Sequence, residues 1–513
     1  MTGRQVKPHL LVKFVCLICC CAILLAQAGC ALAEKPRPPA AYTPGDCPYS
    51  LPTSYKVECG VLNVMENRGD PQSKTIQIQV AVVKTDNPSP APDPVVYLAG
   101  GPGGSGSGEL GMSLGSYSEI LEKRDLIVVD QRGTGYSTPN LDCPEYQKAY
   151  FEALGQQLPY NEFSAASMPA LLACQQRLQD EGIDLSGYNN QESATDLEDL
   201  RQALGYEQWN LLGTSYGTRL ALTVLREFPK GVHSAILDST IPPQVNPYSG
   251  WVYSQERAFR TLFERCAADE QCRKAYPKLE QDFYTLLDKL DAEPAIVQKA
   301  HPLSQKKYDV LVDGDMLIKL IFQLFYYSNT IPHLPSLIEN TLKGDNKTLA
   351  RFMDQLFYSP YGVAWGMNIS VWCSTEAPFT TYAQVEKEVA GAQPRLREGM
   401  LNDQRLALET CAAWEHDTPG KAENQKVKSS VPALVLAGEF DPVTPPDWGQ
   451  QTAEALKNGY FFEFPGLAHG VTGSNDATNG CVNRMMLSFL DDPSKAPDST
   501  CMADLPEFEF LIP

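Results

Sequence analysis

A serine lies at the centre of residues 213–217, which read Gly-Thr-Ser-Tyr-Gly. Residues 209–212 before it are apolar and typical of a strand, and residues 218–228 after it have a helical pattern. A serine on so sharp a strand-to-helix turn needs glycine two residues away on either side, because a Cβ there would collide with the adjoining strand or helix. The pattern predicts that Ser215 is a nucleophile.

A serine hydroxyl becomes a good nucleophile only when a base removes its proton and a carboxylate orients that base. His469 and Asp441 each follow a late apolar segment of the strand type, residues 460–464 and 433–437 respectively. Both side chains are therefore expected at the carboxyl edge of a sheet, beside the serine. We predict a triad of Ser215, His469 and Asp441.

Other carboxylates compete for the role of the acid. Asp238, at the end of the apolar segment 235–237, is the main competitor, and Glu439 is a weaker one. Asp441 itself precedes a proline, and Asp-Pro pairs are also common in plain turns. The remaining histidines do not follow a late strand, so His469 is the predicted base.

Acyl transfer also needs N–H donors aimed at the oxyanion of the transition state. One is expected from the backbone of Tyr216, directly after the serine. The other is expected from Gly101, within residues 100–106, which read Gly-Gly-Pro-Gly-Gly-Ser-Gly after the apolar segment 95–99. A phosphate-binding loop is the rival interpretation, but no Gly-Lys-Ser/Thr follows it. A flexible linker is the plainest alternative.

Apolar segments that recur along the chain must position these loops. Residues 75–83 alternate apolar and polar side chains, the period of a half-buried strand. Mostly apolar segments, separated by helical patterns, follow at 95–99, 126–129, 209–212, 235–237, 433–437 and 460–464. They predict an α/β protein with a mostly parallel sheet covered by helices on both faces. Between 241 and 430 helical patterns dominate, which predicts a helical insertion.

The N-terminus has the pattern of an export signal. Basic residues precede an apolar core, and Ala-Leu-Ala at 31–33 resembles a cleavage site. The core is too short to span a bilayer comfortably, so no transmembrane span is expected in the mature chain. Residues 27–30 also resemble a bacterial lipoprotein processing site, which makes a lipid tether at Cys30 the alternative. The protein is therefore expected in the periplasm or outside the cell.

The whole chain of 513 residues divides into segments of different expected character. In order, we expect a signal peptide, a proline-rich tether, the first part of the core, a helical cap and the last part of the core, at residues 1–33, 34–54, 55–240, 241–430 and 431–513. The formal net charge of −20 would repel phosphate backbones, which makes nucleic-acid binding unfavourable.

Cysteine usage fits an oxidising compartment. Ten cysteines remain after the export segment, at positions Cys47, Cys59, Cys143, Cys174, Cys266, Cys272, Cys373, Cys411, Cys481 and Cys501. An even number suits a disulfide framework whose connectivity the sequence cannot fix, and pairing of nearest neighbours is the simplest hypothesis. No zinc-type pair remains and histidines are scattered, so neither a metal nor another cofactor is expected.

Two motifs carry a resemblance to a known family. Residues 100–103 match most of a His-Gly-Gly-Pro-Gly motif, with Ala99 in place of the histidine, and residues 130–137 read Asp-Gln-Arg-Gly-Thr-Gly-Tyr-Ser. Both are similar to motifs of the α/β-hydrolase aminopeptidases, in particular the secreted tripeptidyl aminopeptidase and prolyl iminopeptidase group. The resemblance implies the α/β-hydrolase fold with a large helical cap inserted after the sixth strand.

The resemblance also implies an activity, a secreted serine exopeptidase that releases residues or short peptides from a free N-terminus. Ser215 would attack, His469 would carry the proton and Asp441 would orient the ring, while Gly101 and Tyr216 would bind the oxyanion. A secreted carboxylesterase or lipase with the same triad is the nearest alternative. A hydrolase-like binding protein without catalysis is the more distant one.

Relatives in this group hold the ammonium of the substrate with carboxylates from the cap. A buried ammonium needs such a partner because its desolvation is costly. Glu376 is the first candidate and Glu415, after Trp414, is the second. Arg132 is expected to brace the loops rather than to contact substrate.

Overall fold

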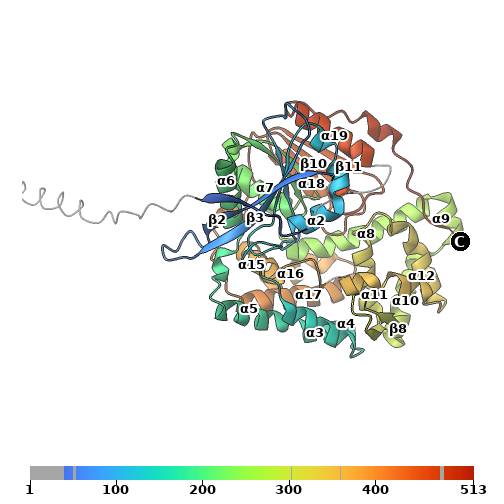
Figure 1. Ribbon diagram of the computed structural model, residues 1–513. Coiled ribbons are helices and arrows are strands. Elements are labelled where there is room, and N and C mark those ends of the chain that lie inside the picture. The colour runs from blue at the N-terminus through green and yellow to red at the C-terminus, as the bar shows by residue number, and fades with distance from the viewer. Residues whose placement is uncertain (1–39, 50–53, 302, 359, 474–478, 513) are drawn as a thin grey trace, which may run out of the picture. The chain divides into compact units, whose positions relative to one another are not determined.

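A computed structural model of the chain describes residues 40–49, 54–301, 303–358, 360–473 and 479–512. The expected export segment and Cys30 lie outside these residues. Among them, nine strands form one sheet (Figure 1). From edge to edge the strands are β1 (Ala41–Gly45), β2 (Lys56–Met65), β3 (Thr75–Lys84), β5 (Leu126–Val129), β4 (Val95–Leu98), β6 (Trp209–Thr214), β7 (Val232–Asp238), β10 (Ala433–Gly438) and β11 (Gly459–Phe464).

Strand directions divide this sheet into two parts. β1, β2, β3 and β5 pair antiparallel to one another in that order, whereas all pairs from β5 to β11 are parallel. The parallel strands are buried along almost their whole length, as expected when helices cover both faces. The predicted fold class, a mostly parallel α/β sheet, is confirmed.

Neighbouring side chains on each central strand point to opposite faces of the sheet. Leu211 and Leu237 join the larger core, whereas Leu212 and Ile236 join the smaller one. The helices α6 (Asn190–Leu204), α7 (Tyr216–Glu227) and α18 (Pro446–Ala455) contribute to the larger core, and α19 (Asn479–Asp491) to the smaller one. The helix α2 (Gly106–Ser113) follows the glycine-rich loop after β4.

The proline-rich segment 34–54 contains more structure than the sequence predicts. Residues 41–45 form the edge strand β1, which pairs with β2. Pro44 is tolerated there because an edge strand needs hydrogen bonds on only one side. The expectation of a plain tether is therefore wrong for these residues.

A long insertion separates β7 from β10. It is not wholly helical, since β8 and β9 pair as an antiparallel hairpin. It follows β7, the seventh described strand, rather than the sixth strand that the resemblance implied. Its elements are α8 (Pro247–Ala268), α9 (Glu270–Ala275), α10 (Leu279–Ala292), β8 (Ala295–Ala300), β9 (Lys307–Val312), α11 (Gly314–Leu324), α12 (Leu334–Leu342), α13 (Lys347–Phe352), α14 (Asp354–Tyr358), α15 (Trp365–Thr375), α16 (Tyr382–Glu388) and α17 (Pro394–Ala413).

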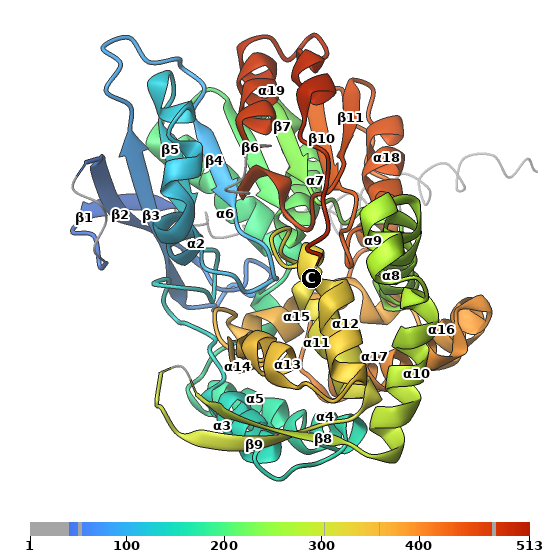
Figure 2. The same ribbon diagram turned by 90° about the vertical axis from the view of Figure 1, so that its right-hand side faces the viewer.

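A second, earlier excursion packs against this insertion. The helices α3 (Pro144–Leu154), α4 (Tyr160–Ser167) and α5 (Ala170–Asp180) lie between β5 and β6 in the chain but contact α11, α15, α17 and β9 (Figure 2). We call the two excursions together the cap layer. Residues 144–180, which the sequence assigned to the core, therefore belong to the cap layer.

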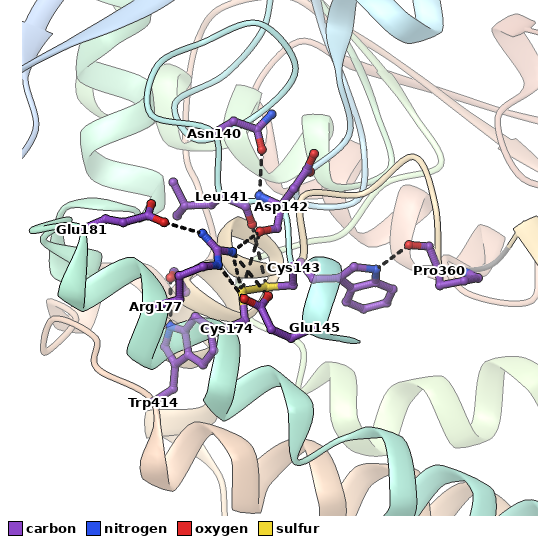
Figure 3. The surroundings of a disulfide bond; sticks show 12 residues. Asn140, Leu141, Asp142, Cys143, Glu145, Cys174, Arg177, Glu181, Pro360 and Trp414 are labelled. Carbon is purple, nitrogen blue, oxygen red and sulfur yellow. Dashed lines mark hydrogen bonds and ion pairs between the residues drawn. A yellow bond between two sulfur atoms is a disulfide. The ribbon is translucent and has the colours of Figure 1, made fainter. Parts of the chain in front are cut away.

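A disulfide closes the earlier excursion on itself. Cys143 precedes α3 and bonds to Cys174 on α5 (Figure 3). Beside it, Arg177 binds Glu145 at 2.5 Å and donates to the carbonyl of Asp142 at 2.7 Å. The start of α3 and the middle of α5 are thus held together by covalent and ionic contacts.

Every disulfide in the described ranges joins cysteines that are neighbours along the chain, as the simplest hypothesis proposed. The pairs are Cys47–Cys59, Cys143–Cys174, Cys266–Cys272, Cys373–Cys411 and Cys481–Cys501. Across the same ranges, none of the helices is both long and apolar enough to cross a bilayer.

Candidate active site

Ser215 lies on the turn between β6 and α7, with φ 57° and ψ −122°. This left-handed backbone is strained for a residue with a side chain. The turn is possible only because of its glycines. A Cβ on Gly213 would lie 2.5 Å from the carbonyl oxygen of Gly217, and one on Gly217 would lie 2.0 Å from that of Leu98. The sequence therefore folds into an elbow that presents the serine at the end of β6.

His469 and Asp441 lie on the loops that leave β11 and β10, as the sequence predicted. His469 Nδ1 is 2.8 Å from Asp441 Oδ2. The carboxylate also accepts hydrogen bonds from the backbone N–H groups of Val443 and Thr444, at 2.9 and 2.8 Å. Burial opposes the charge on Asp441, but His469 and the hydrogen bonds outweigh it and lower the pKa of this carboxyl.

The environment of His469 favours its protonated form. Burial lowers the pKa of the imidazole, but the charges of Asp441, Asp238 and Glu109 and the hydrogen bond to Asp441 together raise it above its usual value. The ring packs edge-on against Tyr326, with centroids 5.0 Å apart. The ring is thus held by its hydrogen bond to Asp441 and by this aromatic contact.

Ser215 and His469 line the same cavity, of about 1130 Å³, together with Gly100 and Gly101. Among the described residues, no hydrogen bond joins the serine hydroxyl to the imidazole. Catalytic hydrogen bonds are often long before substrate binds. The structure thus brings the three predicted side chains to one site, with the histidine–aspartate bond already formed.

The glycine-rich loop passes directly beside the nucleophile. A Cβ on Gly100 would lie 3.2 Å from Ser215 Cβ. Gly101 has φ +113°, and a Cβ there would lie 2.9 Å from the backbone nitrogens of Gly103 and Gly104. Tyr216 begins α7, so its N–H is at a helix N-terminus and needs no partner within the helix. Of the two predicted oxyanion donors, Tyr216 therefore follows Ser215 directly in the chain, and Gly101 lines the same cavity as the serine.

The cap layer and the core both hold this loop. Asn368 of α15 donates to the carbonyl of Pro102 at 2.8 Å. Asp130 accepts from the Ser107 backbone at 2.8 Å and from Ser105 Oγ at 3.0 Å. Arg132, as expected, braces a loop: it is buried against Asp196 with contacts of 2.8 Å and donates to the carbonyl of Glu66, in the loop after β2, at 2.5 Å.

The competing acids have other tasks. Asp238 accepts hydrogen bonds from the backbone of Val471 and Thr472, at 3.0 and 2.8 Å, and so fixes the loop after His469. Glu439 accepts from the backbone of Gly466 at 2.8 Å. The His469 ring bonds to Asp441 instead, which assigns the acid.

The two predicted ammonium-binding residues do not line the cavity. Glu376 is buried and forms an ion pair with Arg219 of α7. Burial raises the pKa of Glu376 to about 8, because the charge of Arg219 offsets only part of the desolvation and Glu423 adds to it. Glu415 is on the surface, where it accepts a hydrogen bond from Gln179 at 2.6 Å. Both predictions are wrong, since the packing of the cap layer turns these carboxylates elsewhere.

Other charged side chains from the cap layer do face the cavity, and the sequence analysis did not identify them. Asp403 on α17 accepts hydrogen bonds from Tyr160 at 2.7 Å and Ser164 at 3.4 Å. Lys319 and Asp315 on α11 line the same cavity. Asp315 is bound to Arg395, whereas Lys319 Nζ is 4.0 Å from Asp403. These residues come from helices far apart in sequence, so no motif could reveal them.

Comparison with known proteins places the chain in a family. A family model described as alpha/beta hydrolase fold matches residues 93–471. The chain therefore belongs to the α/β-hydrolase fold family, and with Ser215, His469 and Asp441 at its site it is a serine hydrolase.

Its relatives include peptidases and an esterase. The chain is 25% identical to serine protease Hip1 of Mycobacterium tuberculosis over 412 residues, which cover 76% of this chain and 77% of the relative. It is 23% identical to tripeptidyl aminopeptidase of Streptomyces lividans over 499 residues, or 92% and 89%. It is also 25% identical to carboxylesterase B of Mycobacterium tuberculosis over 419 residues, which cover 78% of each chain.

Proposed function

We propose that the protein is a serine exopeptidase that releases residues or short peptides from the free N-terminus of peptides. Ser215 attacks the scissile carbonyl, and His469 takes the serine proton and gives it to the leaving amine. Asp441 orients the imidazole and stabilises its charge. The N–H groups of Gly101 and Tyr216 bind the oxyanion.

The observation that carries this proposal is the position of Asp403 in the cavity wall. Its carboxylate comes from the cap layer, on the same cavity as the nucleophile. Burial raises the pKa of Asp403, against the charge of Lys319 and the hydrogen bonds from Tyr160 and Ser164. A carboxylate that is costly to bury alone is stabilised by a cationic ligand, and the ammonium of a peptide is such a ligand.

The length of α11 gives the scale of the released fragment. Tyr326, after the end of α11, contacts the catalytic ring, and Lys319 beside Asp403 lies seven residues earlier in the chain. At 1.5 Å per helical residue this is on the order of 10 Å. An extended peptide covers that span with about three residues. The released fragment is therefore short.

Esterase activity is the second candidate. Most of the cavity wall is apolar or aromatic, including Tyr248, Trp251 and Trp372, which suits an acyl chain as well as a peptide. A relative named carboxylesterase B matches most of the chain.

One experiment separates the two functions. Peptide anilides with a free amine, the same compounds N-acetylated, and nitrophenyl esters are compared as substrates. We expect hydrolysis of the free-amine anilides and a loss of at least tenfold in kcat/KM on acetylation. Ester hydrolysis with no response to the free amine would establish the esterase instead. Ser215→Ala must abolish the activity, and Ser494→Ala on the exposed C-terminal segment is its control.

We also propose that the chain is exported. Disulfides throughout the described core and cap layer support an oxidising compartment. The intact mass of the mature N-terminus tests this, since it distinguishes cleavage after residue 33 from lipidation at Cys30.

A further inference from the structure

Lys319 is a cation inside the cavity of an acidic protein. It lies on α11, and its side chain is one-third exposed, on the cavity that Ser215 also lines. It is the one lysine or arginine among the described residues that line this cavity. Most lysines lie on the outer surface, so a lysine that faces a mainly apolar and aromatic cavity points to an anionic group on the ligand.

The contacts of Lys319 leave its ammonium available. Its nearest carboxylate oxygen is Asp403 Oδ2, at 4.0 Å, which is beyond hydrogen-bond distance. The ammonium also lies 5.5 Å from the centre of the Phe322 ring, which contributes a weak cation–π attraction. Asp315, the other cap-layer carboxylate on this part of the cavity, is already bound to Arg395 at 2.5 Å. The ammonium of Lys319 therefore has N–H donors with which it can bind an anionic group of a ligand.

The distance between Lys319 and Asp403 matches the layout of an acidic amino acid. If Asp403 binds the α-ammonium of the first substrate residue, the side chain of that substrate residue starts from the carbon that carries the ammonium. An Asp or Glu side chain then places its carboxylate a few bonds away, close to Lys319. The pair of opposite charges in the wall is complementary to the pair of opposite charges on the first residue.

We infer that Lys319 determines specificity by pairing with a carboxylate on the first residue of the substrate, so that peptides beginning with Asp or Glu are preferred. The inference rests on the proposed exopeptidase function. An ion pair that is partly open to solvent contributes modestly, so the expected preference is about fivefold to tenfold in kcat/KM.

The test compares three tripeptide anilides that differ only in the first residue, with sequences Glu-Ala-Ala, Gln-Ala-Ala and Lys-Ala-Ala. The unmodified protein should prefer Glu over Gln by about fivefold to tenfold, and this ratio should fall as salt is added. Lys319→Met should bring the ratio close to one, Lys319→Arg should keep it, and Lys319→Glu should move the preference toward Lys.

Lys343→Met is the matched control. Lys343 is an exposed lysine of the cap layer that pairs with Glu339, so its substitution should leave the ratio unchanged. Equal hydrolysis of the Glu and Gln peptides by the unmodified protein overturns the inference and leaves the exopeptidase function standing. A Glu preference that survives in Lys319→Met also overturns it. Failure to hydrolyse any free-amine peptide overturns the proposed function and the inference together.

Discussion

Thr444 Oγ1 donates a hydrogen bond of 2.6 Å to Asp441 Oδ2, the same oxygen that faces His469 Nδ1. The hydroxyl also lies 3.2 Å from that nitrogen. Thr444 therefore fixes the carboxylate oxygen on which the orientation of the catalytic ring depends. The site includes a fourth side chain that acts through Asp441 rather than on substrate.

Replacing Thr444 by valine should lower kcat about tenfold with little change in KM. Valine keeps the shape but removes the donor, so Asp441 keeps its charge and loses part of its orientation. Steady-state kinetics on the best peptide anilide measures this. Thr285→Val, on the exposed face of α10, is the matched control. A rise in KM alone, with kcat unchanged, would contradict the role of Thr444.

The pH dependence of catalysis should follow His469. Only the neutral imidazole can accept the serine proton, and Asp441 is the main group that raises the pKa of His469. We expect kcat/KM to fall with decreasing pH, with an acid limb above the ordinary histidine pKa of about 6.5. Asp441→Asn should move this limb to lower pH and reduce kcat by about 10⁴-fold. An acid limb that stays in place in Asp441→Asn would show that another group titrates.

Glu376 should make the folded state less stable as pH rises. Its pKa in the folded protein is about 8, above the unfolded value of about 4.3, so the folded state holds the extra proton between these values. The free energy of unfolding therefore decreases with pH across this window, by up to about 1.4 kcal/mol per pH unit from this group. Glu376→Gln should remove that slope in urea titrations at pH 5 to 8. Glu415→Gln, on the surface, should leave it intact.

Asp403→Asn should weaken selection for a free amine. Asparagine keeps the hydrogen-bonding shape but loses the charge that pairs with ammonium, so kcat/KM for free-amine anilides should fall about 10- to 100-fold. The rate for N-acetylated anilides should change little. Parallel losses for both substrate classes would mean that Asp403 supports the cavity wall rather than the ammonium. Asp309→Asn, on the exposed hairpin β8–β9, is the control.

Loss of the Cys143–Cys174 disulfide should destabilise the cap layer. The double serine variant should lower the free energy of unfolding by about 2–5 kcal/mol, and KM should rise, because α3 and α4 line the cavity. The sequence separation is 31 residues here and 6 for Cys266–Cys272. Loop closure then makes the Cys143–Cys174 pair more stabilising than Cys266–Cys272 by roughly 1.5 kcal/mol. Equal losses for the two pairs in thermal or denaturant unfolding would contradict this.

The triad could be predicted from the sequence because strands, and the loops that follow them, have local sequence patterns. The glycines around Ser215, and the apolar segments before Asp441 and His469, each fix a side chain at the sheet edge without reference to distant contacts. The sequence left open which carboxylate is the acid of the triad. Only the hydrogen bond of Asp441 to His469 in the structure distinguishes Asp441 from Asp238.

The ammonium-binding residues could not be predicted in the same way. Asp403 and Lys319 meet where α4 packs against both α11 and α17, which no short motif encodes. Glu376 has the right residue type, but its position after α15 turns it toward Arg219. Likewise, the three helices after Cys143 have ordinary amphipathic patterns, so nothing in them indicates that they leave the core.

The cap layer is assembled from two separate stretches of chain, one before the nucleophile and one after it. Exchanging the later stretch alone with that of a relative would leave in place the part of the cavity wall formed by α3 and α4, which would then not match the exchanged helices. A chimera meant to alter substrate range must carry both stretches.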